Sequence, residues 1–482
     1  MMWKKTKRFS QIVACTMLFC ASVQGRQKDV PWNHGRLVVS EENRYLKHED
    51  STPFFWLGDT GWLLPERLNR DEAVFYLRTC EEAGFNVVQV QTINGVPAMN
   101  CYGKRSMTEM FEMESEGQTE TYGYWDHMDY IVRTAEQHGI YIGMVCIWGG
   151  LVKNGKMDVA QAKIYGEFLA RRYGSSPNII WIIGGDVQGD VKTEVWEMLA
   201  CTIKSIDRNH LMTFHPFGRT TSATWFNNAE WLDFNMFQSG HRRYGQSRSG
   251  ELSAPMKDNA EEDNWRYVEY CLSMSPMKPV IDAEPSYEQI PQGLHDPTEK
   301  RWEASDVRRY AYWSVFSGAF GHTYGNNSIM QFYRPGIQPA YGAKKPWWEA
   351  LKDPGYNQMK YLKRLMLLFP FFERVPDQTL IVGANGERYD RVIATRGVDY
   401  LLAYNHTGIR MRIDLTKISG DRKHAWWYDP SNGHLEYLGL YRNGEAVFEY
   451  GGWKKGESDR VLIVVDSTRH YLDPSWTEIP AL

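Results

Sequence analysis

Short apolar runs and amphipathic helical patterns alternate along most of this chain, and this alternation constrains the fold more than any other feature. For example, the helical pattern NRDEAVFYLRTCEEAGF is followed at once by the apolar run NVVQVQTI. Runs of strand character begin at Pro53, Asn86, Tyr141, Asn178, Leu211, Trp231, Pro279 and Ala319. Strands that alternate with helices form parallel βαβ units, and eight units over about 290 residues predict an α/β fold, a (β/α)8 TIM barrel. The helical pattern is weak only between Gly218 and Trp231.

A doubly wound open sheet also alternates strands with helices and is the competing arrangement. Such a sheet usually has a glycine-rich phosphate loop of the form GxGxxG after its first strand. The corresponding stretch here is WLGDTGW, which does not have that spacing. The barrel is therefore favoured.

The loops of the predicted barrel differ between its two ends. Connections from helix to strand are only a few residues long, whereas strand-to-helix connections at 92–124, 241–263 and 326–346 are long and rich in tyrosine, arginine, asparagine and glycine. In a TIM barrel the strand-to-helix loops form the functional face. We therefore expect the site at the carboxyl ends of the strands.

The pattern changes near Pro370, where helical periodicity gives way to short alternating runs such as VDYLLAYNH, HAWWYDPSNG and DRVLIVVDS. Turn residues separate these runs every ~8–12 residues, as in a small β-sandwich. We expect three segments: a signal peptide at 1–25, the barrel with an N-terminal hairpin at 26–370, and an all-β sandwich domain at 371–482.

The N-terminus is typical of an export signal. Lysine and arginine residues precede a short apolar stretch at 12–23, and small or neutral residues follow at 23–25. The sequence IVAC at 12–15 resembles a bacterial lipobox, but little apolar sequence precedes it. We expect an exported protein that is periplasmic rather than a surface lipoprotein. No later stretch approaches the ~18–20 apolar residues of a membrane-spanning helix.

Composition excludes several classes of protein. The net charge is −4 and there is no basic stripe, so nucleic acid is not an expected partner. Five cysteines follow the predicted signal peptide without CxxC spacing, which predicts neither a disulfide framework nor a zinc site. We expect no metal and no other cofactor. Aromatic residues make up 14% of the chain, which suits a large core or a sugar-binding cleft.

Polar and aromatic residues lie at the ends of the predicted strands, where side chains converge in a barrel. Asp186 follows the fourth strand and Glu284 follows the seventh. The substrate-binding residues expected around them are Asp59, Gln91, Trp148, His215, Gln238, Tyr287, His322 and Tyr324. Two facing carboxyl groups are what glycoside hydrolysis needs. One donates a proton to the leaving oxygen, and the other attacks the anomeric carbon or activates water.

Each candidate also has a purely structural explanation. Asp186 could cap the following helix or occupy a turn. Glu284 could form an ion pair with an arginine such as Arg242. Asp59 could cap the first loop or bind a substrate hydroxyl. His215 and His322 could be core residues whose hydrogen bonds are satisfied within the protein. The joint placement of Asp186 and Glu284 on one barrel favours catalysis over these alternatives.

Several stretches resemble one known family. The sequences FFWLGDTGW, AGFNVVQVQ, NIIWIIGGD and PVIDAEPSYE, with the terminal AWWYDPSNG and DRVLIVVD, are similar to the apiosidase-like proteins, the family 140 glycoside hydrolases of gut Bacteroidetes and their relatives. The resemblance covers nearly the whole chain after the predicted signal peptide. It implies a barrel of the large clan of retaining glycosidases. It also implies a C-terminal domain that looks like the family's carbohydrate- or collagen-binding domain.

The resemblance also implies roles for individual residues. In that clan the acid/base follows the fourth strand and the nucleophile follows the seventh, and these positions map onto Asp186 and Glu284. The usual pair at the acid position is Asn-Glu, whereas Gly185 and Asp186 stand here, as in the apiosidase-like subgroup. Because aspartate is one methylene shorter, we expect the glycines to let the backbone approach the substrate more closely.

The substrate class implied by the resemblance is β-linked apiose in the pectic polysaccharide rhamnogalacturonan II. The expected partner is therefore an oligo- or polysaccharide. A retaining mechanism predicts that the two carboxyl groups lie ~5–5.5 Å apart. The alternatives are another furanosidase, such as an arabinofuranosidase, or a non-catalytic glycan-binding protein.

Overall fold

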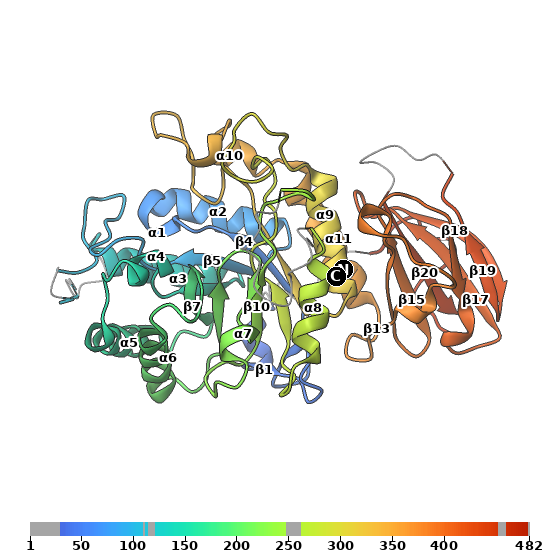
Figure 1. The fold of residues 1–482 in the computed structure, drawn as a ribbon, viewed down its shortest axis with the longest axis horizontal. Helices are drawn as coiled ribbons and strands as arrows, with labels where there is room; N and C mark the ends of the chain where they lie inside the picture. The colour runs from blue at the N-terminus through green and yellow to red at the C-terminus, as the bar shows by residue number, and fades with distance from the viewer. Residues whose placement is uncertain (1–28, 109–110, 114–120, 247–261, 452–458, 481–482) are drawn as a thin grey trace, which may run out of the picture.

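The computed structural model describes residues 29–108, 111–113, 121–246, 262–451 and 459–480. A mixed α/β unit, coloured from blue to light orange in Figure 1, is followed by an all-β unit in darker orange and red. The predicted signal peptide lies outside the described residues. No helix in the described ranges is long and apolar enough to cross a membrane.

Eight strands form the barrel, and they are β4 (Trp56–Thr60), β5 (Val87–Gln91), β6 (Tyr141–Val145), β7 (Ile179–Val187), β8 (Met212–Pro216), β10 (Asn235–Gln238), β11 (Val280–Asp282) and β12 (Gly321–Tyr324). Their order is β8-β7-β6-β5-β4-β12-β11-β10, and paired neighbours are parallel. The ring closes between β8 and β10, where the Asp233 amide donates to the Met212 carbonyl at 2.9 Å. A short strand β9 (Thr220–Thr221) pairs antiparallel with β10. The predicted TIM barrel is confirmed.

The first barrel strand differs from the prediction, which placed it at Pro53–Leu57. Pro53–Phe54 form β3, which pairs antiparallel with β2 (Leu46–His48), and β2 in turn pairs with β1 (Leu37–Val39). The barrel strand β4 begins only at Trp56. The apolar run FFWL suits both sheets, so its sequence contains no signal for the break between them.

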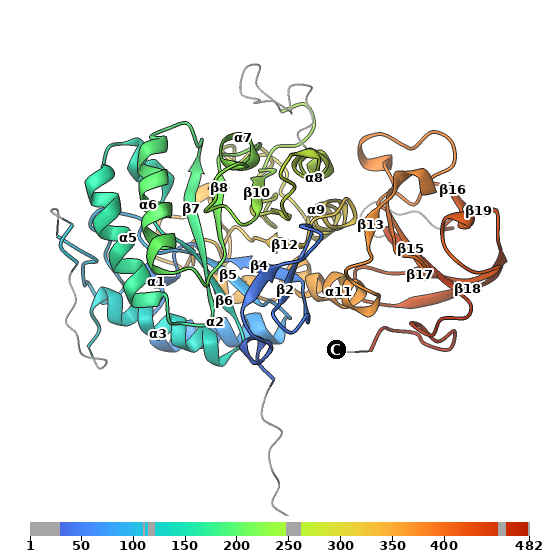
Figure 2. The ribbon, with the colours of Figure 1, turned by 90° about the horizontal axis from the view of Figure 1, so that it is seen from below.

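Helices surround the barrel (Figures 1 and 2). They are α1 (Leu64–Arg67), α2 (Arg70–Glu82), α3 (Tyr124–Gln137), α4 (Gly149–Lys153), α5 (Val159–Tyr173), α6 (Thr193–Ile206), α7 (Ala223–Phe226), α8 (Asn264–Ser273), α9 (Ala304–Phe316), α10 (Trp347–Ala350) and α11 (Pro354–Leu368). Capping boxes start α2 at Asn69 and α5 at Asp158. The weak helical pattern before Trp231 corresponds to the single turn α7.

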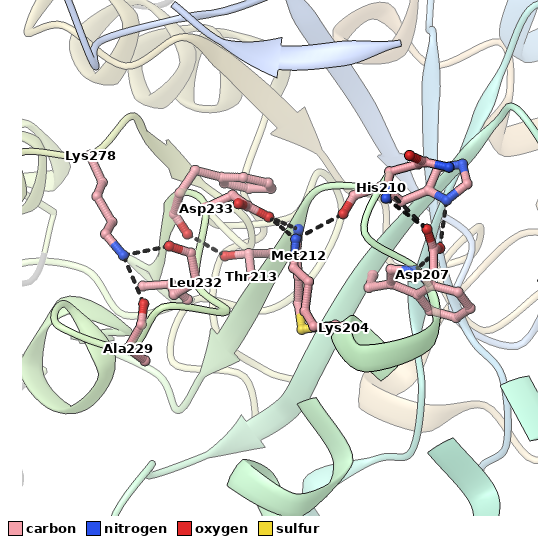
Figure 3. A network of polar contacts seen from close by, with 12 residues as sticks. Lys204, Asp207, His210, Met212, Thr213, Ala229, Leu232, Asp233 and Lys278 are labelled. Carbon is pink, nitrogen blue, oxygen red and sulfur yellow. Dashed lines mark hydrogen bonds and ion pairs between the residues drawn. The ribbon is translucent and has the colours of Figure 1, made fainter. Parts of the chain in front are cut away.

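A polar network supports the amino-terminal ends of β8 and β10 (Figure 3). Asp233 accepts hydrogen bonds from the Lys204 Nζ and from the Met212 amide, both at 2.6 Å. Asp207 at the end of α6 pairs with His210 at 2.6 Å. These groups satisfy each other where the chain enters the barrel. None of them lines the cleft described below.

The all-β unit follows α11. Its six-stranded sheet has the order β13-β14-β15-β20-β17-β18, and a two-stranded ribbon pairs β16 with β19. The strands are β13 (Val375–Pro376), β14 (Ile393–Arg396), β15 (Tyr400–Asn405), β16 (Met411–Asp414), β17 (Arg422–Tyr428), β18 (Leu435–Arg442), β19 (Glu445–Phe448) and β20 (Arg460–Asp466). The ribbon packs on one face of the sheet, as expected for a small sandwich.

The other face of the six-stranded sheet packs against the barrel. Along β15, Leu401 and Ala403 belong to the apolar core shared with the ribbon, whereas Leu402 and Tyr404 belong to the core shared with the barrel. Successive side chains of a strand point to opposite faces. Helices α9 and α11 lie beside this domain in both views (Figures 1 and 2). Burial on both faces explains why these strands are almost continuously apolar.

A buried ion pair joins the two units. Arg308 of α9 donates to both oxygens of Asp459, with its Nε at 2.9 Å and its Nη2 at 2.7 Å, and the Tyr404 hydroxyl donates to the same carboxylate at 3.1 Å. The side chains of Arg308 and Asp459 are 3% and 2% exposed. A bidentate pair of this kind fixes orientation as well as distance.

We predict that Asp459→Ala lowers the free energy of unfolding by about 3–5 kcal/mol, because it leaves the Arg308 charge buried without its carboxylate. The control is Glu82→Ala. Glu82 pairs with Arg78 at 3.7 Å on the surface, with both side chains more than half exposed, and its loss should cost no more than about 0.5 kcal/mol. Urea denaturation of both variants measures the difference. Equal effects would contradict a structural role for the buried pair.

Candidate active site

The end of β7 carries Asp186 on an irregular stretch of backbone. Gly184 and Gly185 have φ values of 87° and 111°, and Asp186 has a φ of 51°. The pairing with β8 shifts register between Gly184 and Val187, which is the signature of a β-bulge. Asp186 does not cap a helix, because α6 begins after Lys192. The bulge instead turns the aspartate out of the regular strand alternation.

The two glycines are required by their surroundings. A Cβ at Gly184 would lie 2.7 Å from the His215 carbonyl oxygen, and one at Gly185 would lie 2.8 Å from the Trp148 ring. Both positions also have left-handed φ values that favour glycine. We expected the glycines to bring the backbone towards the substrate. The structure shows that they make room for Trp148 and for the neighbouring strand.

Glu284 lies two residues beyond β11 and is held by two histidines. The Nε2 of His241 is 3.1 Å from one carboxylate oxygen, and the Nε2 of His215 is 3.4 Å from the other. The Asp186 amide donates to the His215 Nδ1 at 3.4 Å, which leaves the Nε2 of His215 to carry the proton that faces Glu284. Burial alone would raise the pKa of Glu284. Hydrogen bonds from both histidines, together with their electrostatic interactions with the carboxylate, lower this pKa to about 2.

Asp186 has the opposite shift. Its side chain is accessible from the cleft, yet the surrounding protein desolvates the carboxyl group. Burial raises the pKa of Asp186 to about 6, and the negative charge of Glu284 adds to this effect. Electrostatic interactions with His215 and His241, and a hydrogen bond from the Gly218 amide, act in the other direction. One carboxyl group is thus kept ionised and the other is kept protonated until near neutral pH.

Both carboxyl groups line an open cleft of about 770 Å³. Gln91, Trp148, Gln238 and Tyr287, predicted from the sequence, line it as well. The side-chain oxygens of Gln91 and Gln238 are buried and have no hydrogen-bond partner within the described part of the chain. Buried polar atoms are normally satisfied, so these two are suited to accept hydrogen bonds from sugar hydroxyl groups.

Aromatic rings form one wall of the site. Trp62 lies 5.6 Å from Trp148 and 5.5 Å from the His215 ring, measured between ring centroids. The Trp62 indole donates to the Tyr287 hydroxyl at 3.0 Å, and Tyr287 also hydrogen-bonds Glu284. His215 is fully buried behind this wall, so it acts on Glu284 and does not line the cleft.

Asp59, His322 and Tyr324 do not line the cleft as we expected. Asp59 accepts a hydrogen bond from Tyr76 of α2 at 2.7 Å, and Tyr324, its pairing neighbour on β12, donates to Glu288 at 2.5 Å. Both side chains therefore lie in the layer between strands and helices, because alternate residues of a strand point to opposite sides.

His322 and Asp59 show how burial shifts pKa values away from the cleft. His322 is fully buried, and its ring nitrogens have no hydrogen-bond partner among the described residues. Burial lowers the pKa of His322 to about 3, so the ring is neutral. Burial also raises the pKa of Asp59 to about 7, against the hydrogen bonds from Tyr76 and the Thr60 amide. Both residues are part of the barrel structure.

Several lining residues were not predicted, and they are Trp62, Arg219, His241, His295 and Tyr341. His241 follows the sixth strand by only three residues, so its position at a strand end was the available signal. Tyr341 comes from the long loop after β12. Burial and the charges of Asp186 and Glu284 raise the pKa of Tyr341. The position of Tyr341 beside these two carboxyl groups depends on how the loop folds.

Arg242 was considered as an ion-pair partner of Glu284. It also lines the cleft, but the ion-pair partners of Glu284 are His215 and His241.

The described residues contain no group of histidine, cysteine and acidic side chains that could hold a metal ion. The cleft has two carboxyl groups with opposite pKa shifts, beside two histidines and an aromatic wall.

Residues 40–373 match the family model described as "Apiosidase-like, catalytic domain". The chain belongs to the apiosidase-like family. A second model, described as "Putative collagen-binding domain of a collagenase", matches residues 375–465 of this apiosidase-like protein. The first match contains both carboxyl groups of the cleft, and the second begins with β13 and ends within β20.

Solved structures are similar to this chain over almost its whole length. A glycoside hydrolase of family 5 from Bacteroides vulgatus is 62% identical with a TM-score of 0.92, and the match covers 94% of this chain and 98% of the other. A second structure, described as a glycoside hydrolase, is 65% identical with a TM-score of 0.90. The match covers 92% of this chain and 100% of the other. No curated protein matches. The apiosidase-like protein is a glycoside hydrolase.

We predict that kcat/KM falls as the pH rises through about 6, because a general acid must be protonated to donate to the leaving oxygen, and the pKa of Asp186, the expected acid, is raised to about 6. Activity should hold at lower pH until Glu284 is protonated near its pKa of about 2, or until the protein unfolds. A pH profile of kcat/KM measures both limits. A plateau that extends above pH ~8 would contradict the role expected of Asp186.

We predict that Gly185→Ala lowers kcat/KM by roughly 100-fold, because the new methyl group displaces Trp148 or the bulge that carries Asp186. Gly155→Ala is the matched control. Gly155 also has a positive φ, of 72°, but a Cβ there meets nothing within 4 Å. The control should show only backbone strain of about 1–2 kcal/mol in a thermal melt, with nearly normal activity. Similar activities for the two variants would show that the crowding at Gly185 does not matter.

Proposed function

We propose that this apiosidase-like protein is a retaining glycoside hydrolase that cleaves β-apiosidic linkages of the pectic polysaccharide rhamnogalacturonan II. The observation that carries the proposal is the pair of carboxyl groups in one cleft with pKa values of about 6 and about 2. A glycosidase that forms a covalent intermediate needs one carboxyl group of each kind.

Each residue has a defined role in the proposed reaction. The Glu284 carboxylate attacks the anomeric carbon while the bond to the leaving oxygen breaks, and Asp186 transfers its proton to that oxygen. Asp186, now ionised, then takes a proton from water. The water oxygen attacks the same carbon and releases Glu284. The charge lost by Glu284 in the first step removes one cause of the raised Asp186 pKa, which favours the change of role.

The proposed substrate rests on the family. The matched description names an apiosidase-like catalytic domain, and the resemblance in sequence implies β-linked apiose. The geometry is compatible with a sugar, because the cleft combines an aromatic wall with the side-chain oxygens of Gln91 and Gln238, which have no hydrogen-bond partner among the described residues. The N-terminal pattern at 1–25 supports action outside the cytoplasm, and we propose a periplasmic location.

The test is to incubate the protein with rhamnogalacturonan II oligosaccharides and identify the sugar at the new reducing end. We predict apiose, first released as the β-anomer seen by NMR. Asp186→Asn should lower kcat roughly 10²–10⁴-fold, because it removes the general acid, and Glu284→Gln should abolish turnover. Asp190→Asn is the control, since Asp190 is exposed four residues further on and does not line the cleft.

The outcomes separate the parts of the proposal. Release of arabinose in place of apiose would identify an arabinofuranosidase and overturn the substrate. Release of the opposite anomer would overturn retention. Retention would be supported independently if azide restored turnover of Asp186→Ala on an aryl glycoside, whose leaving group departs without protonation, with formation of a β-glycosyl azide. Azide needs no general base to attack the glycosyl-enzyme.

A further inference from the structure

A short segment beside Glu284, Gly240–Tyr244, carries two residues into the cleft. We call it the strap. Its His241 side chain contacts Glu284, and Arg242 lines the cleft. The first end of the strap is held by the barrel. The Gly240 amide donates to the Glu284 carbonyl at 3.1 Å, and the His241 carbonyl accepts from the Gly293 amide at 2.7 Å and from the Trp302 indole at 3.1 Å.

The second end of the strap is held by a buried carboxylate. The Tyr244 amide donates to a Glu262 oxygen at 2.8 Å, and the other Glu262 oxygen accepts from Arg309 of α9 at 2.6 Å. The side chains of Glu262 and Arg309 are both 0% exposed. A hydrogen bond to a buried charge is among the stronger contacts that a loop can make.

The Glu262 oxygen that accepts from the Tyr244 amide also accepts a hydrogen bond from the C-terminal β domain. The Tyr389 hydroxyl lies 2.6 Å from this oxygen, although Tyr389 as a whole is 39% exposed. Tyr389 belongs to the 3-10 helix η4 (Arg388–Asp390). Its ring packs edge-to-face on the Tyr244 ring at 5.2 Å, and the Arg388 guanidinium lies 5.0 Å from the centre of the same ring.

The backbone around Tyr389 is constrained. Arg388 has a φ of 52°, which a non-glycine residue adopts at a cost. The neighbouring Asp390 accepts a hydrogen bond from Thr407 at 2.7 Å, which ties η4 to its own domain. Strain of this kind persists only where the surroundings fix it. Here it places a hydroxyl group of one domain on a carboxylate beside the active site of the other.

We propose that Tyr389 is a positioning residue for the active site: through Glu262 and Tyr244, the β domain holds the strap so that Arg242 faces the cleft. His241 is anchored separately through its carbonyl group. Loss of the Tyr389 hydroxyl therefore loosens mainly the Arg242 side of the strap. The effect falls on substrate binding more than on the chemistry at Glu284.

The experiment compares Tyr389→Phe with Tyr404→Phe in the full chain. Both remove one hydroxyl group from the interface between domains, but Tyr404 donates to Asp459 and lies on a different contact. Hydrogen exchange of residues 240–246 is measured by mass spectrometry. We expect roughly tenfold faster exchange in Tyr389→Phe and no change in Tyr404→Phe. Exchange in Tyr389→Phe within twofold of the control would overturn the proposal.

A kinetic arm uses rhamnogalacturonan II oligosaccharides and rests on the proposed function. We expect Tyr389→Phe to raise KM roughly 3–10-fold with kcat within twofold, whereas Tyr404→Phe leaves both unchanged. An equal loss of kcat and kcat/KM would overturn the assignment to substrate binding. If the wild-type enzyme does not cleave this glycan, the proposed substrate fails, while the exchange arm still decides the role of Tyr389.

A second variant tests the same contact in case Tyr389→Phe does not fold correctly. Arg388→Ala removes an exposed side chain that lies over the Tyr244 ring, and it leaves the Glu262 hydrogen bond in place. We expect hydrogen exchange at 240–246 to be faster in Arg388→Ala as well, but by a smaller factor than in Tyr389→Phe. Thermal melts of all variants are recorded alongside. If exchange at 240–246 became faster in Tyr389→Phe and Tyr404→Phe alike, in proportion to the loss of melting temperature in each, the protein would have become less stable as a whole. That result would overturn the proposal.

Discussion

A carboxylate buried at the end of a barrel strand stays ionised only if positive or hydrogen-bonding groups surround it, and Glu284 meets this condition with two histidines. His215 comes from β8 and His241 follows β10, so the barrel must close before the three side chains meet. The remaining features of the site depend on this contact. The charge of Glu284 helps to raise the pKa of Asp186 and that of Tyr341 across the cleft.

The bulge at the end of β7 is the second requirement. A regular strand would direct Asp186 by simple alternation, and the glycines before it allow a left-handed path that turns the carboxyl group into the cleft. The same glycines let Trp148 pack against the strand. The strained backbone at Asp186 therefore has two neighbours that fix it. Trp148 of the aromatic wall packs against Gly185, and the His215 Nδ1 accepts a hydrogen bond from the Asp186 amide.

The β domain shares a continuous apolar core with the barrel, and its six-stranded sheet is covered on both faces. The Arg308–Asp459 pair fixes how the two units meet. Domains joined in this way are expected to move as one body. A domain that matches a family model for collagen binding is therefore also part of the framework around the cleft, through the contact of Tyr389 with Glu262.

The sequence by itself determined the barrel, the β domain and the positions of Asp186 and Glu284, because period and loop length depend on local residue order. It did not determine which strand-end side chains face the cleft. Asp59 and Tyr324 occupy strand ends but point towards the helices, since their direction depends on exact strand bounds and register. His241 was missed because its role exists only once β10 and β11 are neighbours. Tertiary structure decided these matters, since barrel closure alone brings distant residues within a few ångströms of one carboxylate.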